Sequence, residues 1–202
     1  TLYANMVRNR NFNNELMQVT VDMGDAEGRV FRYDIRRNLA DYTWNTWYLQ
    51  LTNLRDINTI ASQPESLNRS YQGISRITEA WVSQLLTDVY GDVPYFDANK
   101  GKDGVLEPAF DKQKDIYLQL LKNLDTANVL FNSTKALTFG GDMLYNANTV
   151  SGNTNAGIVK WKKFANSLKL RLLLRLSKRD GELNITEQIN TILSNPVQFP
   201  VF

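Results

Sequence analysis

The chain has 202 residues, with 23 Lys and Arg against 21 Asp and Glu, so its net charge of +2 favours neither nucleic acid nor an anionic membrane as a partner. It contains no cysteine and no histidine. These absences exclude Ser-His-Asp and Cys-His nucleophilic sites, zinc sites of the Cys/His type, His-ligated haem and disulfides. No apolar run approaches the ~18 residues that a membrane helix needs. Any catalysis would therefore rest on Asp, Glu, Lys, Tyr or Ser.

Residues 1–41 form a polar N-terminal segment of mixed composition, which we treat as a candidate ligand-site loop. The glycines at 24 and 28, each beside an acidic residue, are typical of turns. Short extended pieces are predicted at 16–21 and 29–33. Because the chain opens with Thr1 rather than Met, we expect a mature form or a fragment.

A 3.6-residue hydrophobic period begins at Tyr42 and predicts a helical scaffold over 42–202. Its helices are expected at about 42–62, 67–90, 111–131, 160–178 and 184–194. The third helix is expected to face inward with its apolar positions, which are Ile116, Leu120, Leu121, Leu124, Ala127 and Phe131. Asp111 and Asn184 are the expected N-caps of the third and fifth helices. The fourth helix has a wide apolar band that includes Leu174, so we expect it to lie buried between neighbours. The fold class predicted is therefore all-α, an array of helical pairs with long loops and no sharp 34-residue repeat.

Three local patterns favour structural roles over chemistry. The stretch 97–108 alternates oxygen ligands, but Lys102 and Pro108 stand where an EF-hand calcium loop needs Gly and Glu. The Gly140-Gly141-Asp142 run follows no convincing strand and precedes no Lys-Ser/Thr pair, so a flexible connector is predicted rather than a phosphate loop. Eight Lys and Arg fall between 160 and 179. We expect them to pair with acids of adjacent helices rather than to bind nucleic acid.

Aromatic side chains outside the helical stripes are the remaining signal. Phe, Trp and Tyr make up 11% of the chain, and Tyr33, Tyr42 and Tyr95 fall in loops or at helix ends. A sugar needs such rings for stacking, and neighbouring Asn, Asp and Arg to bind its hydroxyls. For any single ring the alternative is that it pins a loop onto the core. As a set, the rings favour binding over catalysis.

Three motifs resemble the SusD/RagB family of surface nutrient-binding lipoproteins, in its SusD-like branch. Residues 80–98, AWVSQLLTDVYGDVPYFDA, resemble the family's helix followed by a Gly-Asp-Val-Pro turn, and 108–127, PAFDKQKDIYLQLLKNLDTA, are similar to its next helix. GDMLY at 141–145 and KWKKFANSLKLRLLLRLS at 160–177 are similar to its helix after the long loop. The motifs occur in the family's order over about 44–180.

The resemblance implies a tetratricopeptide-like helical scaffold carrying ligand-binding loops, as part of a larger SusD-like fold that continues beyond residue 202. It implies a non-catalytic protein without cofactor or metal, lipid-anchored to the outer membrane and facing outward, although the lipid-bearing cysteine is not in this chain. The implied partners are a SusC-like TonB-dependent transporter barrel and an oligosaccharide or peptide captured for uptake. Basic residues of the fourth helix, Lys169, Arg171 and Arg175, are then structural.

Family members often build part of the ligand site before the first repeat helix, which here points to residues 33–44. The predicted ligand-binding residues are Tyr33, Arg36, Asp41, Tyr42, Trp44 and Tyr95. Trp44 equally suits the core, because it shares a helical stripe with Trp47 and Leu51. Two other functions stay open: a helical-repeat adaptor that binds protein, and a carboxylate-based glycoside hydrolase, for which the sequence pairs no two acids at a usable separation.

Overall fold

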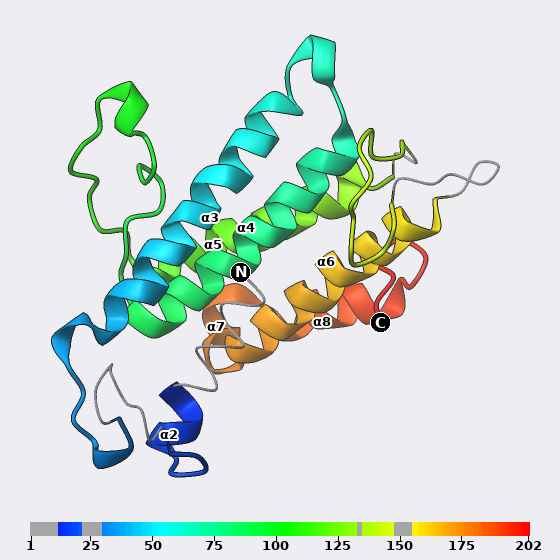
Figure 1. Ribbon diagram of the computed structural model, residues 1–202. Coiled ribbons are helices and arrows are strands. Elements are labelled where there is room, and N and C mark those ends of the chain that lie inside the picture. Colours follow the sequence, from blue (N-terminus) through cyan, green and yellow to red (C-terminus); the bar gives the residue numbers. More distant parts are fainter. Residues whose placement is uncertain (1–11, 22–29, 133–134, 148–154) are drawn as a thin grey trace. The chain divides into compact units, whose positions relative to one another are not determined.

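The computed structural model describes residues 12–21, 30–132, 135–147 and 155–202 (Figure 1). The α-helices are α2 (Asn14–Leu16), α3 (Asp41–Ile60), α4 (Arg69–Tyr90), α5 (Gln113–Leu130), α6 (Ala156–Arg175), α7 (Asp180–Leu183) and α8 (Ile185–Ser194). The 3₁₀ helices are η2 (Val30–Arg32), η3 (Arg37–Ala40), η4 (Pro64–Ser66), η5 (Gly101–Asp103) and η6 (Ser177–Arg179). Strand-like pairing among the described residues is limited to one isolated bridge, so the all-α class is confirmed.

The chain divides into two compact parts, Thr1–Gln50 and Leu51–Phe202, which are described separately. In the first part, the predicted extended pieces are wrong. Backbone carbonyls of Asn13 and Asn14 accept the N–H groups of Met17 and Val19 at 2.9 and 2.8 Å, which closes a helical turn there. Val30–Arg32 likewise forms η2. The predicted turns at 24 and 28 lie outside the described residues.

The second part is a succession of packed helices, in which α4 packs on α5, α5 on α6 and α6 on α8. The chain reverses direction from α4 to α5 and again from α5 to α6 (Figure 1). The predicted inward face of α5 is buried throughout: Ile116, Leu120, Leu121, Leu124, Ala127 and Phe131. On α6, Leu172 and Leu173 are fully buried, but Leu174 is 62% exposed, so the apolar band is narrower than predicted. Within the described residues, no helix is both long and apolar enough to cross a membrane.

Two aspartates hold the loop between α4 and α5, and Asp92 takes the capping role that was expected of Asp111. Lys112, rather than Asp111, occupies the N-cap position of α5. The Asp111 carboxylate instead accepts the backbone N–H groups of residues 95–96 at 2.8 and 2.9 Å. Asp92 reaches across the turn and accepts the N–H of Gln113 at 2.8 Å, which satisfies an otherwise orphan donor of α5. The predicted Asp111 cap is therefore wrong.

The cap of α8 also differs from the prediction. Asn184 stands at the N-cap position in a left-handed conformation, with no capping hydrogen bond from its side chain. Asp180 replaces it, because its carboxylate accepts both the backbone N–H and the hydroxyl of Thr186, at 2.7 and 2.8 Å. A carboxylate from the preceding turn thus caps α8.

Basic side chains of α6 pair with acids of neighbouring helices, as predicted. The Lys169 ammonium lies 2.6 Å from the carboxylate of Asp125 on α5. The Arg175 guanidinium lies 2.7 Å from that of Asp88 on α4. These pairs join three consecutive helices and account for two of the charges on the basic stripe.

The loop before α6 is anchored rather than a flexible connector, which corrects the prediction for 140–142. The carboxylate of Asp142 accepts the indole N–H of Trp161 at 2.8 Å and the backbone N–H groups of Leu144, Tyr145 and Ala147 at 3.1, 3.2 and 3.0 Å. Sequence inspection missed this residue because its partners are mostly backbone donors, which leave no pattern in the sequence.

Candidate functional site

Five of the six predicted ligand-binding residues lie in the first part of the chain, in the short segment that ends in the first turns of α3. Tyr33 follows η2 with a φ of 60° and is 62% exposed. Arg36 is exposed and extended just before η3, and Asp41 is the first residue of α3. Tyr42 is 47% exposed. The segment therefore presents two tyrosine rings beside a cation and a carboxylate on a stretch of ten residues.

Trp44 differs from these residues because it is half-buried. Its ring lies 4.8 Å from that of Tyr48, one helical turn away, at an interplanar angle of 53°. Farther along the same stripe, Trp47 and Leu51 are buried. Trp44 thus stands at the border between the exposed start of α3 and its buried stripe.

Tyr95 lies in the second part and is only 4% exposed. Its hydroxyl accepts a hydrogen bond from the Asn123 amide at 3.1 Å, and the Arg55 guanidinium lies 5.2 Å from its ring centroid. Burial, and then the charge of Glu79, raise the pKa of Tyr95, so its hydroxyl stays protonated. In this structure the ring of Tyr95 fixes its loop on the core, which is the structural role that the sequence analysis gives as the alternative to ligand binding.

Arg55 organises the base of the loop that carries Tyr95. Its guanidinium donates to the backbone carbonyls of Ala98 at 2.6 Å and Tyr95 at 2.7 Å, and forms an ion pair with Glu79 at 3.2 Å. Sequence reasoning missed this residue. Arg55 falls four positions after the buried Leu51, so a charge on the buried face of a helix was the available signal.

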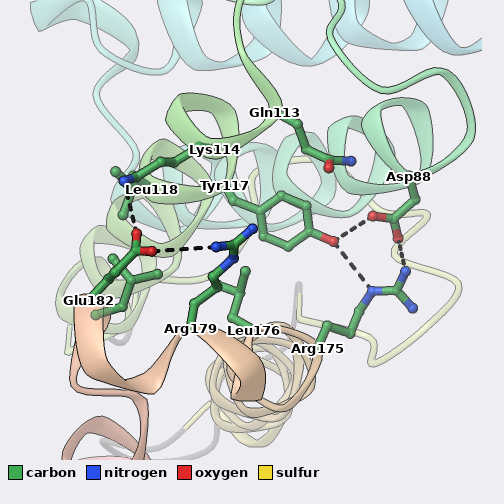
Figure 2. Close-up of a pocket in the computed structure, with 10 residues that line it drawn as sticks. Asp88, Gln113, Lys114, Tyr117, Leu118, Arg175, Leu176, Arg179 and Glu182 are labelled. Carbon is green, nitrogen blue, oxygen red and sulfur yellow. Dashed lines mark hydrogen bonds and ion pairs between the residues drawn. The ribbon is translucent and has the colours of Figure 1, made fainter.

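A polar cleft of about 700 Å³ opens in the second part, where the ends of α4 and α6 meet the start of α5, and α7 (Figure 2). We call it the α5–α7 cleft. Its lining residues are Asp88, Gln113, Lys114, Tyr117, Leu118, Arg175, Leu176, Arg179, Glu182 and Leu183. This volume lies within the ~300–1,000 Å³ of small-molecule sites. None of these residues belongs to the predicted site.

One wall of the cleft is a three-residue cluster that joins α4, α5 and α6 (Figure 2). The Tyr117 hydroxyl donates to Asp88 at 2.5 Å and accepts from the Nε–H of Arg175 at 3.3 Å. Asp88 also pairs with the Arg175 Nη2 at 2.7 Å. Burial, and then the hydrogen bond to Asp88, raise the pKa of Tyr117 to about 12. The hydroxyl is therefore a protonated donor at neutral pH.

The opposite wall is a second charged cluster, centred on Glu182 (Figure 2). Its carboxylate lies 3.0 Å from the Lys114 ammonium and 3.4 Å from the Arg179 guanidinium. Hydrogen bonding to Lys114 and the nearby positive charges lower the pKa of Glu182. With Arg175 and Asp88 opposite, the cleft holds three cations against two carboxylates. One positive charge is left without a carboxylate of its own.

The calcium-like stretch contains an internal ion pair, since the Asp97 carboxylate lies 2.7 Å from the Lys100 ammonium. Across the ranges that the structure describes, no three acidic side chains come together in a group that would hold a metal ion. No described cluster therefore suggests a cation site.

Comparisons with known proteins give one family. The model of the family described as "SusD-like_2: Starch-binding associating with outer membrane" matches residues 1–202. A search of curated protein sequences found no match.

Solved structures of SusD homologues share the fold of this chain. Two from Bacteroides fragilis NCTC 9343 are each 26% identical to it, with TM-scores of 0.64 and 0.60 over 78% and 74% of the chain. An outer-membrane protein of Bacteroides vulgatus ATCC 8482, described as involved in nutrient binding, is 25% identical over 78% of the chain, with a TM-score of 0.62. The chain spans only 29–31% of these three proteins. Since the family model covers the chain from its first residue to its last, this chain belongs to the SusD-like family.

Proposed function

We propose that the chain is part of a non-catalytic binding protein that captures an oligosaccharide, or in the alternative a peptide, at the cell surface. Its partner is a SusC-like TonB-dependent transporter, which takes up the captured ligand, and a lipid holds the protein on the outward face of the outer membrane. The observation that carries the proposal is the match of the whole chain to a family described as starch-binding and associated with the outer membrane. The long relatives named above are the basis for placing the chain within a larger protein.

The proposed site is the exposed segment that leads into α3. The rings of Tyr33 and Tyr42 are accessible to the C–H faces of sugar rings, because each exposes about half or more of its surface. Arg36 and Asp41 lie between them in the sequence and supply a donor and an acceptor for hydroxyl groups. Trp44 is half-buried and lies two positions after Tyr42, at the border of the buried stripe. Tyr95, whose ring is buried in the second part of the chain, is left out of the proposed site.

A binding role also agrees with the carboxylates of the α5–α7 cleft. A glycoside hydrolase needs one carboxylic acid whose pKa is raised, so that it is protonated at neutral pH. Glu182 has a lowered pKa, which does not suit a general acid, and the carboxylate of Asp88 forms an ion pair with Arg175 at 2.7 Å.

The site is tested by titrating maltohexaose, a starch-type oligosaccharide, into the protein by isothermal titration calorimetry. Removing a stacking ring costs roughly 0.5–1.5 kcal/mol beyond lost area, so Tyr33→Ala and Tyr42→Ala should each weaken binding about threefold to tenfold. Both rings are exposed, so the melting temperature should stay nearly constant. Phe139→Ala serves as the matched control, because it removes an aromatic residue that is 75% exposed and lies outside the proposed site.

Unchanged affinity in both tyrosine variants would refute the site assignment. Binding of peptides but of no glycan would favour the peptide alternative, and exposed apolar surface that binds a folded protein would favour the adaptor.

A further inference from the structure

The α5–α7 cleft carries an excess of positive charge that the proposed function does not use. The Nε group of Arg175 donates to the Tyr117 hydroxyl, and its Nη2 pairs with the carboxylate of Asp88. The Nη1 of Arg179 pairs with the carboxylate of Glu182 at the long distance of 3.4 Å. Its remaining N–H donors have no partner among the described residues, and the side chain is 67% exposed. A planar guanidinium with free donors at the mouth of a cleft is suited to bidentate binding of a carboxylate.

The start of α5 adds to the positive potential of this cleft. Gln113 and Lys114 belong to the first turn of an 18-residue helix, and both line the cleft. The partial positive charge of this helix end is already met by Asp92, which accepts the N–H of Gln113, and by Asp115 in the first turn, so the cation that α5 brings to the cleft is Lys114. The ammonium of Lys114 lies on the same wall. One added carboxylate would balance the three cations with three acids.

The remaining lining fits the body of a sugar rather than a bare ion. Leu118, Leu176 and Leu183 add apolar surface to the lining of the cleft. A pyranose ring can place its C–H groups on such a surface while its polar groups reach the walls. The volume of about 700 Å³ is also far larger than a single small anion requires.

We propose that the α5–α7 cleft is a second carbohydrate subsite that binds a uronic acid residue, with Arg179 holding the sugar carboxylate. This inference rests on the proposed function, because it assigns the class of glycan that the protein captures. It gives the protein a preference for acidic oligosaccharides and assigns that preference to a cleft that neither Tyr33 nor Tyr42 lines.

The test uses two probes with the same sugar backbone: trigalacturonic acid, which carries carboxylates, and its methyl ester, in which each carboxylate is replaced by a neutral ester. Each is titrated into the 202-residue chain by calorimetry, with wild-type protein, Arg179→Ala and Lys178→Ala compared. Lys178 is the matched control, because it is the preceding residue of η6, is exposed, and does not line the cleft. The melting temperature of each variant checks that the fold is intact.

We expect the acid to bind at least about tenfold more tightly than the ester, since a hydrogen bond to a charged group contributes ~1.5–3 kcal/mol. Arg179→Ala should remove that preference, and Lys178→Ala should retain it. Equal binding of acid and ester, no binding of the acid, or equal effects of the two variants would overturn the proposal.

The second subsite can fail while the proposed function stands. If maltohexaose binds through Tyr33 and Tyr42 but the acid has no advantage over its ester, the second subsite alone is refuted. To test whether the cleft acts independently of the tyrosines, the acid and ester titrations are repeated in the Tyr33→Ala/Tyr42→Ala double variant. There the ratio of acid to ester affinity should match that of wild type, because neither tyrosine lines the cleft. Loss of the ratio in that variant would contradict a separate site.

Discussion

Replacing Asp142 by alanine should lower the free energy of unfolding by more than a substitution outside the apolar core usually does. Its carboxylate accepts four hydrogen bonds. Water can replace it for the backbone donors of Leu144 and Tyr145, which are not buried, so each of those two bonds contributes only a fraction of ~1 kcal/mol. The indole N–H of Trp161 and the backbone N–H of Ala147 are different, because these residues are only 4% and 0% exposed, and each donor would lose its partner at a cost of ~1–3 kcal/mol. The expected total is about 2–6 kcal/mol.

The same contacts predict how this effect depends on pH. Partial burial acts to raise the pKa of Asp142, but hydrogen bonds from Trp161 and the loop backbone outweigh it, so the pKa is lowered. A lowered folded-state pKa contributes stability that is present above the unfolded value of about 3.9 and is lost as pH falls through the folded value. The difference between wild type and Asp142→Ala should therefore be full at pH 7 and smaller at pH 2.

The assay is urea unfolding followed by tryptophan fluorescence at both pH values. Asp56→Ala is the control, since it removes an exposed carboxylate from α3 and should change the free energy of unfolding by less than about 0.5 kcal/mol. If Asp142→Ala unfolds like this control at pH 7, the loop is not anchored as described. If its difference from wild type is as large at pH 2 as at pH 7, the ionised carboxylate is not the source of the effect.

Two further predictions concern packing and the cleft. Gly157→Ala should lower the free energy of unfolding by ~1–3 kcal/mol in the same assay, because a Cβ there would lie 2.6 Å from the Cα of Ala147. Gly181→Ala is the control, since a Cβ at that position meets open space and should leave the protein as stable or more stable. Equal stabilities of the two variants would contradict the close approach at Gly157. Tyr117, with its pKa raised to about 12, contributes stability that is present below about pH 10 and is lost as pH rises through 12. Tyr117→Phe should therefore lose less stability than wild type between pH 9 and 12, and an alkaline limb as steep as that of wild type would argue against a buried, Asp88-bonded hydroxyl.

Hydrophobic periodicity was sufficient to predict the all-α class and the inward face of α5. The six apolar positions predicted on that face, the first being Ile116 and the last Phe131, are all buried. It failed where hydrogen bonds decide the local structure. Asp111 is a good capping residue by type, yet the bridge to Val93 places its carboxylate against the neighbouring loop, and Asp92 satisfies α5 instead. A residue's type predicts that it can cap a helix, but not which helix it reaches.

The candidate sites show the same limit. The tyrosines at 33 and 42 were predicted as site residues because rings outside a helical stripe stand out in a sequence, and both rings are exposed. The α5–α7 cleft was not found, because its charged residues come from four elements: Asp88, Lys114, Arg175 and Glu182 are separated by up to 94 positions. Individually each is an ordinary charged residue on a helix or turn, and only the packing of α4, α5 and α6 brings them together.

The central claim, that the chain binds glycan without cleaving it, is tested most directly by equilibrium dialysis against maltohexaose. The ligand is then recovered and its mass measured. The account predicts saturable binding that is weakened in the Tyr33→Ala/Tyr42→Ala variant, with the hexasaccharide recovered intact. Shortened products that the wild-type protein forms, or no retention of glycan above the dialysis control, would contradict it.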